Sequence, residues 1–168
     1  MASKSLKPRA KRLKRLICST MFALLSRAIK ACYRLDDRVK GEFDEMPQGT
    51  VLKLSVLPSG PALIIKKEQD EIITLKEISV KPSIEIAFKN IESALLALSA
   101  EKSVSRCFAE QRFIIYGDLS LGAAFVRIIN IVEAYLFPRI WASYLMNGYA
   151  PSRKRSVIRI YLATIFGI

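Results

Sequence analysis

The sequence of 168 residues contains no histidine, and this absence removes several classes of enzyme. Histidine is the usual general base near neutral pH and the commonest metal ligand, and no Ser-His-Asp or Cys-His mechanism operates without it. Cysteine is scarce, since Cys18, Cys32 and Cys107 are scattered without metal-ligand spacing or a C-x-x-C pair. Their odd number favours reduced, buried thiols over a disulfide framework. We therefore expect no metal site.

Motifs for nucleotides and cofactors are also missing. The sequence has no P-loop and no dinucleotide fingerprint, and the stretch from Gly117 to Gly122 lacks the G-x-S-x-G spacing of a nucleophile elbow. We interpret Gly117 as a tight strand-to-helix turn and Asp118 as a helix N-cap. No two carboxylates are placed as a general acid and base. The sequence therefore predicts a protein without catalytic residues and without a cofactor.

No stretch has the composition of a membrane span. Residues 119–137 are long enough, but Arg127 and Glu133 would each cost about 2.5–3.5 kcal/mol near the bilayer centre. Arg127, Asn130 and Glu133 instead share the polar stripe of a helix that is otherwise mostly apolar. The apolar tail, residues 157–168, is shorter than the roughly 20 residues that a span requires. We expect an amphipathic helix over residues 119–137, packed on a sheet.

Positive charge is abundant and lies almost entirely in the N-terminal quarter of the chain. Of the formal net charge of +12, residues 1–40 contribute +10, from twelve Lys and Arg against two Asp, and the remainder contributes only +2. A protein that follows nucleic acid with its whole fold carries basic residues on the fold itself. Aromatic residues are not interleaved with the basic segment, as stacking on bases requires. We therefore do not expect nucleic acid as a partner.

The basic segment also has helical periodicity. Its apolar residues from Leu13 to Cys32 recur at i, i+3, i+4 and i+7, which predicts one amphipathic helix over about residues 10–35. The helix could dock on the domain by its apolar face, or lie on an anionic membrane surface. A cleaved targeting peptide is a third interpretation, against which the regular helical phase argues. In the membrane interpretation the residues at the surface are Lys7, Arg9, Lys11, Arg12, Lys14, Arg15, Arg27 and Lys30.

The middle of the chain predicts an α+β fold. Alternating or apolar runs bounded by turn residues predict five strands, at residues 50–57, 62–66, 72–75, 84–89 and 113–116. Short helices are expected at residues 91–100 and 103–110, and residues 36–49 read as a linker. Because residues 113–116 are apolar on both faces, we expect that strand to be covered on both sides. The chain divides into a basic helix at residues 1–40, a domain at 49–137 and a helical, apolar extension at 138–168.

Three stretches of this domain resemble a known family. They are Pro61-Ala62, the strand Ile84-Glu85-Ile86-Ala87-Phe88 leading into a helix, and above all the segment from Arg112 to Leu121 with its strand ending in Gly117-Asp118. Together they are similar to the sterol carrier protein type-two lipid-binding domain, including bacterial members that assist ubiquinone biosynthesis. The resemblance covers roughly residues 49–137. It implies a five-stranded, mostly antiparallel sheet covered by helices around a hydrophobic tunnel, with no catalytic residues.

The resemblance implies binding of a long-chain lipid, such as a sterol, a phospholipid, a fatty acyl chain or an isoprenoid quinone precursor. We expect a cytoplasmic protein associated peripherally with membranes. An alternative is a scaffold whose N-terminal helix binds a partner protein in a lipid or quinone biosynthesis complex. Apolar periodicity marks a filled core and a lined cavity alike, so each lining residue could instead belong to a solid core. The predicted lining residues are Ile84, Ile86, Phe88, Leu95, Leu98, Phe108, Phe113, Ile115, Leu121, Phe125, Ile128, Ile129 and Leu136.

Overall fold

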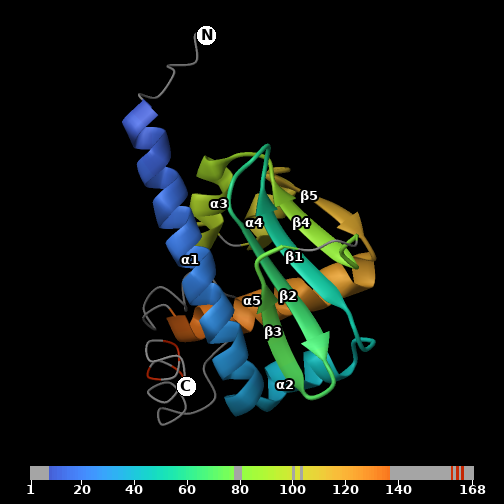
Figure 1. The fold of residues 1–168 in the computed structure, drawn as a ribbon. Coiled ribbons are helices and arrows are strands. Elements are labelled where there is room, and N and C mark those ends of the chain that lie inside the picture. The colour runs from blue at the N-terminus through green and yellow to red at the C-terminus, as the bar shows by residue number, and fades with distance from the viewer. Residues whose placement is uncertain are drawn as a thin grey trace.

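The computed structural model describes residues 8–77, 81–99, 101–102, 104–136, 160, 162 and 164. Five strands form one sheet in the order β3-β2-β1-β4-β5 (Figure 1). The strands are β1 Val51–Val56, β2 Ala62–Glu68, β3 Glu71–Leu75, β4 Ile84–Phe88 and β5 Phe113–Gly117. The helices are α1 Pro8–Leu35, α2 Asp37–Asp44, α3 Ile91–Leu98, α4 Val104–Ala109 and α5 Leu119–Leu136. The predicted α+β fold, with a five-stranded sheet and a long N-terminal helix, is confirmed.

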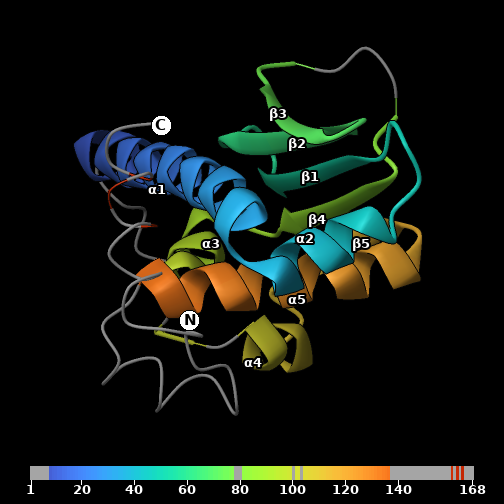
Figure 2. The same cartoon turned by 90° about the horizontal axis from the view of Figure 1, so that it is seen from below.

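The sheet is mixed because one crossover returns the chain beside its first strand. Strands β1 and β4 are parallel, with Leu54 opposite Ile86, whereas the other three pairs are antiparallel. Side chains at alternate positions of β1 and β4, among them Leu52, Leu54 and Ile86, are buried in the core. The helices cover this face: α1 lies against β2 and β3, and α5 against β4 and β5 (Figure 2).

The long helix α1 has two apolar stripes, where the sequence pattern suggested one. Phe22, Leu25, Ile29 and Cys32 are at most 3% exposed and pack in the core, so this stripe docks on the domain. A second stripe on another face, which we call the α1 stripe, is exposed. The α1 stripe consists of Leu13, Leu16, Ile17 and Leu24. Docking on the domain, one of the roles considered for this helix, therefore accounts for one stripe only.

The prediction of a linker over residues 36–49 is wrong. Residues Asp37–Asp44 form α2, and its side chains Val39 and Phe43, one turn apart, are fully buried. Asp36 is the N-cap, since its carboxylate accepts a hydrogen bond from the backbone N–H of Arg38 at 2.9 Å. The polar composition hid this helix because a short helix needs only two inward residues to dock.

Two expectations about exposure are also wrong. Tyr116 of β5 is 48% exposed, so the face of this strand that carries Tyr116 is not covered. The strand also lies at the edge of the sheet. Glu133 was placed on the polar stripe of α5, yet it is buried. Glu133 lies about two turns beyond Val126, which is partly buried against the core, so this flank of α5 is covered by the fold and not open to solvent.

The turn between β5 and α5 has the predicted geometry. Gly117 has a φ of +112°, and a Cβ at this position would lie 2.3 Å from the carbonyl oxygen of Ser83. Asp118 caps α5, because its Oδ1 accepts hydrogen bonds from the backbone N–H groups of Ser120 at 2.7 Å and Leu121 at 3.4 Å. Both interpretations of this turn are confirmed.

Within the part of the chain that the structure describes, two helices, residues 11–35 of α1 and α5, are long and apolar enough to cross a membrane by length and composition. About half of each is buried inside the fold, as in a core helix. Of the extension predicted over residues 138–168, only residues 160, 162 and 164 lie within the described part. Ile160 is buried in the core, and the hydroxyl of Thr164 donates a hydrogen bond to its carbonyl oxygen at 2.7 Å. The rest of that prediction lies outside the described residues.

Candidate functional site

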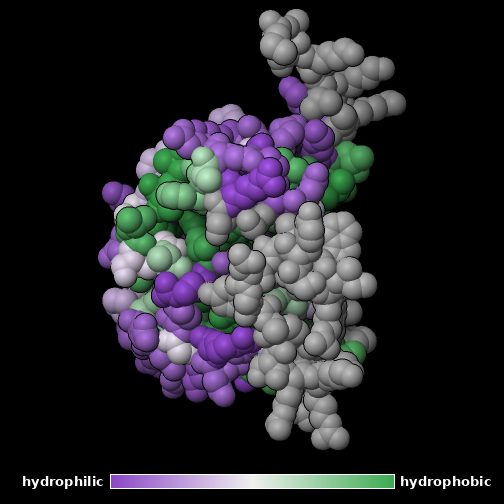
Figure 3. Space-filling view, turned by 180° about the vertical axis from the view of Figure 1, so that it is seen from behind, coloured by the Kyte–Doolittle hydropathy of each residue, from purple (hydrophilic) through white to green (hydrophobic). Residues whose placement is uncertain are grey.

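A pocket of about 380 Å³ opens between α4, β5 and the first half of α5. Seen from behind, this part of the surface is a hollow, apolar area bordered by polar side chains (Figure 3). We call it the α4–β5–α5 pocket. It is lined by Val104, Phe108, Phe113, Ile115, Leu119, Gly122, Ala123, Val126 and Arg127. Volumes of roughly 300–1,000 Å³ with mostly apolar walls are typical of small-molecule sites.

Aromatic rings form one wall of the pocket. The ring of Phe113, buried on β5, lies 5.8 Å from that of Phe88 in an edge-on arrangement. The ring of Phe108 lies 5.8 Å from Phe113 on the other side. Phe108 and Leu119 are 59% and 68% exposed, which places large apolar side chains at the surface beside the opening. Exposed apolar groups around a hollow favour a ligand that buries them.

Small residues on α5 leave room for the pocket. Gly122 lines it, and a Cβ there would lie 3.3 Å from Cδ1 of Ile84 and 3.6 Å from Cγ2 of Ile115. The helix therefore approaches the sheet closely at Gly122. The next residue, Ala123, is exposed and has only a methyl group, so this surface of α5 stays open.

An ion pair between α5 and α2 lies at the pocket. Arg127 lines it, and the guanidinium donates hydrogen bonds to Glu42 of α2, from Nε to Oε1 at 2.6 Å and from Nη2 to Oε2 at 2.8 Å. This two-point geometry is the strong arrangement for a guanidinium and a carboxylate. It links α2 to the pocket-lining part of α5.

Two buried titratable groups, Cys107 and Glu133, lie on the helices α4 and α5 that border the pocket. Burial raises the pKa of Glu133 from an ordinary value of 4.5 to about 8. Burial also raises the pKa of Cys107, the residue beside Phe108 on α4, and outweighs the positive charge of Arg112, which lowers it. No hydrogen bond to the Glu133 carboxyl is present within the described part of the chain. Among those residues, no three Cys, Asp or Glu side chains gather as metal ligands.

The predicted lining residues fall into three groups. Phe108, Phe113 and Ile115 line the pocket. Leu95, Leu121 and Leu136 are partly buried against the core. The other seven are core residues, at most 7% exposed: Ile84, Ile86, Phe88, Leu98, Phe125, Ile128 and Ile129. The hydrophobic tunnel and its lining by these residues stay predictions. A lipid chain that enters the fold would have to displace some of the core side chains.

Six pocket residues were not found from the sequence. Apolar periodicity identifies the face of α5 that packs into the core. The pocket instead lies beside that face, at residues such as Ala123 and Val126. The run of small residues Gly122-Ala123-Ala124 in the first half of this helix is the signal that could have indicated the pocket. The six are Val104, Leu119, Gly122, Ala123, Val126 and Arg127.

The predicted membrane-surface residues are also divided. Lys11, Arg12 and Arg27 are exposed and Lys30 is half-buried. Lys14 instead forms an ion pair with Glu92 of α3 at 2.9 Å, and Arg15 donates to the carbonyl of Ser59, so both hold α1 to the domain. Lys7 and the side chain of Arg9 lie outside the described residues.

Comparison with solved structures identifies the fold. The chain is similar to a ubiquinone synthesis protein described as UbiJ-SCP2, with a TM-score of 0.50 and 17% identity over 71% of this chain and 98% of that one. It also matches sterol carrier protein 2 like 2 from Aedes aegypti, with a TM-score of 0.37, 14% identity and 58% and 94% coverage. A palmitated form of that protein gives a TM-score of 0.39, 18% identity and 60% and 91% coverage.

The sequence matches no family model and none of the curated proteins. The resemblance to sterol carrier protein type-two domains is confirmed by the match in structure, at low sequence identity.

Proposed function

We propose that this chain, which has the fold of sterol carrier protein type-two domains, binds a long-chain lipid without catalysing a reaction on it. The observation that carries this proposal is the α4–β5–α5 pocket, whose lining is apolar at eight of nine residues. The UbiJ-SCP2 structure supports the fold only, and its name suggests an isoprenoid quinone precursor as one candidate lipid. A sterol, phospholipid or fatty acyl chain fits the same chemistry.

The binding energy comes from hydrocarbon removed from water. Each buried methylene contributes about 0.8 kcal/mol. Micromolar affinity, about 8 kcal/mol, therefore needs about ten buried methylenes before the cost of association is counted, and about fifteen once roughly 4 kcal/mol of that cost is included. A longer chain can continue over the exposed side chains of Phe108 and Leu119 at the opening. Affinity should therefore rise with chain length.

Filling the pocket should abolish this binding. Ala123→Trp places an indole in the opening, and we expect it to lower the affinity for a fluorescent long-chain lipid at least tenfold, because the chain loses the space it occupies. Ala62→Trp on β2 is the matched control, since Ala62 is also exposed but does not line the pocket. Titration of both variants with the same lipid gives the comparison.

Organic extraction and mass spectrometry of the purified protein test the proposal directly. Recovery of a stoichiometric lipid supports it. Absence of lipid from the extract, together with no binding of fluorescent fatty acids or quinones, would rule out the carrier function.

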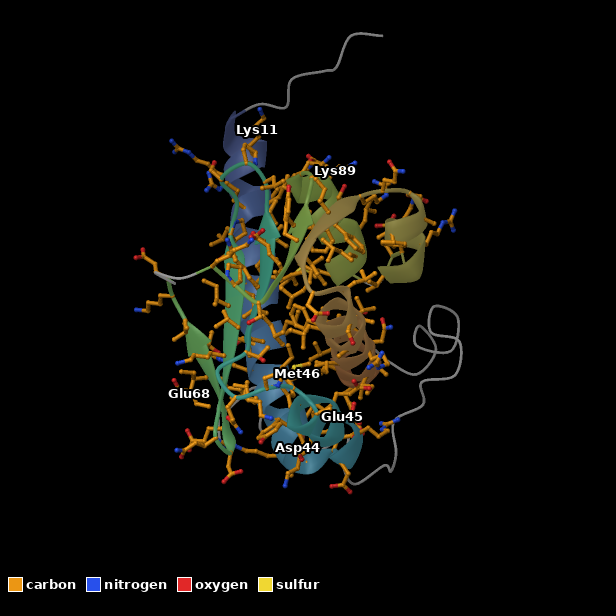
Figure 4. The ribbon with its side chains drawn as sticks, turned by 90° about the vertical axis from the view of Figure 1, so that its right-hand side faces the viewer. Lys11, Asp44, Glu45, Met46, Glu68 and Lys89 are labelled. Atoms are coloured by element: carbon orange, nitrogen blue, oxygen red, sulfur yellow. The ribbon has the colours of Figure 1, made fainter. Side chains whose placement is uncertain are left out.

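We propose further that α1 brings the domain to anionic membranes from the cytoplasm. The α1 stripe is an apolar surface flanked by Arg12 and Arg27, in the part of the chain with a net charge of +10. Figure 4 places Lys11 and Lys89 toward one end of the molecule and Asp44 and Glu68 toward the other. An anionic surface would therefore attract the Lys11 end. Three buried free cysteines are consistent with a reducing compartment.

Leu16→Glu should weaken vesicle binding without unfolding the domain, because Leu16 is 65% exposed on the docked helix. Flotation with phosphatidylglycerol vesicles should recover the wild-type chain at low salt and lose it at high salt, since salt screens charges beyond about 10 Å at 0.1 M. Ser19→Glu adds the same charge to an exposed polar position of α1 and should have a smaller effect.

The scaffold alternative uses the same surface, because an exposed apolar stripe also suits a partner helix. Membrane docking is excluded if the wild-type chain ignores anionic vesicles at low salt. Loss of a protein partner from the Leu16→Glu variant would then favour the scaffold.

A further inference from the structure

The α4–β5–α5 pocket has a chemically distinct point in its wall. Of its nine described lining residues, Arg127 alone carries a charge, and the other eight have no polar side-chain group. A cavity with apolar walls and one cation matches a ligand with a hydrocarbon chain and a single acidic group. Guanidinium groups bind carboxylates and phosphates through two parallel hydrogen bonds, which gives direction as well as attraction.

Glu42 already occupies the position that such an acidic group would take. Its two carboxylate oxygens accept from Nε and Nη2 of Arg127 at 2.6 and 2.8 Å, so the guanidinium is oriented for two-point binding before any ligand arrives. The pair is partly open to water, since the Arg127 and Glu42 side chains are 44% and 19% exposed. A partly exposed ion pair contributes little net stability, so exchanging its carboxylate for another costs little.

We propose that Arg127 binds the acidic head group of the ligand and that this group replaces the Glu42 carboxylate on the guanidinium. This inference rests on the proposed lipid-binding function and adds a ligand class to it: amphiphiles with a carboxylate or phosphate head. The chain lies along the apolar wall between Phe113 and Val126, with its head at Arg127. The Glu42 side chain turns toward water on the surface of α2.

Two consequences follow for specificity. The domain prefers an acid over the uncharged ester with the same chain, because only the acid carries the charge that Arg127 recognises. Glu42 competes with the ligand, so removing its charge strengthens acid binding. The ion pair between α2 and α5 is also broken whenever an acidic ligand is bound, which couples pocket occupancy to the position of α2.

The experiment compares a fluorescent polyene fatty acid, parinaric acid, with its methyl ester. We expect the wild-type chain to bind the acid more tightly than the ester. Arg127→Met keeps the length of the side chain but removes the charge, and should weaken acid binding about tenfold to one-hundredfold while leaving the ester nearly unchanged. Glu42→Gln should strengthen acid binding about threefold to tenfold and leave the ester unchanged.

Arg106→Met is the matched control. Arg106 is an exposed cation on α4 that does not line the pocket, so its loss tests general attraction of the acid by positive charge. The double variant Arg127→Met/Glu42→Gln removes both partners and guards against a misfolded single variant, and it should bind the acid as weakly as Arg127→Met.

The outcomes separate this inference from the function on which it rests. If acid and ester bind equally well, or if Arg127→Met weakens both alike, the head-group role of Arg127 is wrong while lipid binding stands. The same conclusion follows if Arg106→Met reduces acid binding as much as Arg127→Met. If neither probe binds the wild-type chain, the proposed function itself fails.

Discussion

Asp36→Ala should lower the free energy of unfolding by about 2–4 kcal/mol, because one buried carboxylate serves three partners. It caps α2, accepts from the Arg38 guanidinium at 3.1 and 2.8 Å, and accepts from the hydroxyl of Tyr135 at 2.6 Å. Loss of the cap accounts for about 1 kcal/mol. The remainder comes from the hydroxyl of Tyr135, a residue that is only 2% exposed, because this hydroxyl would lose its bond to the Asp36 carboxylate.

Asp118→Ala is the matched control for this experiment. Asp118 also caps a helix, but it is exposed, and within the described residues its carboxylate accepts only from two backbone N–H groups at the start of α5. Its loss should cost about 1 kcal/mol in urea unfolding. Equal destabilisation by the two substitutions would show that the contact between Asp36 and Tyr135 adds nothing to the cap.

The contribution of Asp36 to the stability of the fold also depends on pH. Burial by itself would raise the pKa of Asp36, but hydrogen bonds from Arg38 and Tyr135 outweigh it and hold this pKa below the ordinary value of 3.8. A lowered pKa in the folded state means stability that is present above pH 3.8 and lost as the pH falls through the folded value. Asp36→Ala should therefore destabilise the protein least at strongly acidic pH.

These contacts show where prediction from the sequence stops. Asp36 and Tyr135 are 99 residues apart, and no local pattern pairs them. By contrast, the Gly117-Asp118 turn was predicted because its geometry depends on adjacent residues. The strands and long helices were predictable for the same reason, since periodicity of two or 3.6 residues is a local property.

The pocket required the packed structure. Phe125 and Val126 are adjacent apolar residues of α5, yet one is fully buried in the core and the other lines the pocket. Which of them meets open space depends on how α4 and β5 pack beside α5, and periodicity within one helix does not give the position of its neighbours. The same dependence explains Glu133, whose burial could not be inferred from a helix that appeared polar on that side.

Glu133→Gln should stabilise the protein by roughly 3 kcal/mol at pH 7, in the opposite direction to most substitutions of buried residues. Burial raises the pKa of Glu133 to about 8 in the folded state, against an ordinary value of 4.5. The folded state therefore favours the protonated acid, while the unfolded state ionises. Stability is fully present below pH 4.5 and is lost as the pH rises toward 8, at roughly 1.4 kcal/mol per pH unit.

Urea unfolding of both proteins between pH 4 and 8 measures this difference. The free energies of unfolding of the two proteins should agree near pH 4, because Glu133 is then largely protonated in both states and the amide of Gln resembles the protonated acid. Above pH 5 the two free energies should diverge steadily. Glu101→Gln removes the same charge from an exposed position, so its stability should follow the wild-type curve. A constant gap between wild type and Glu133→Gln would mean that the carboxyl has the same pKa in the folded and the unfolded chain, contrary to the effect of its burial.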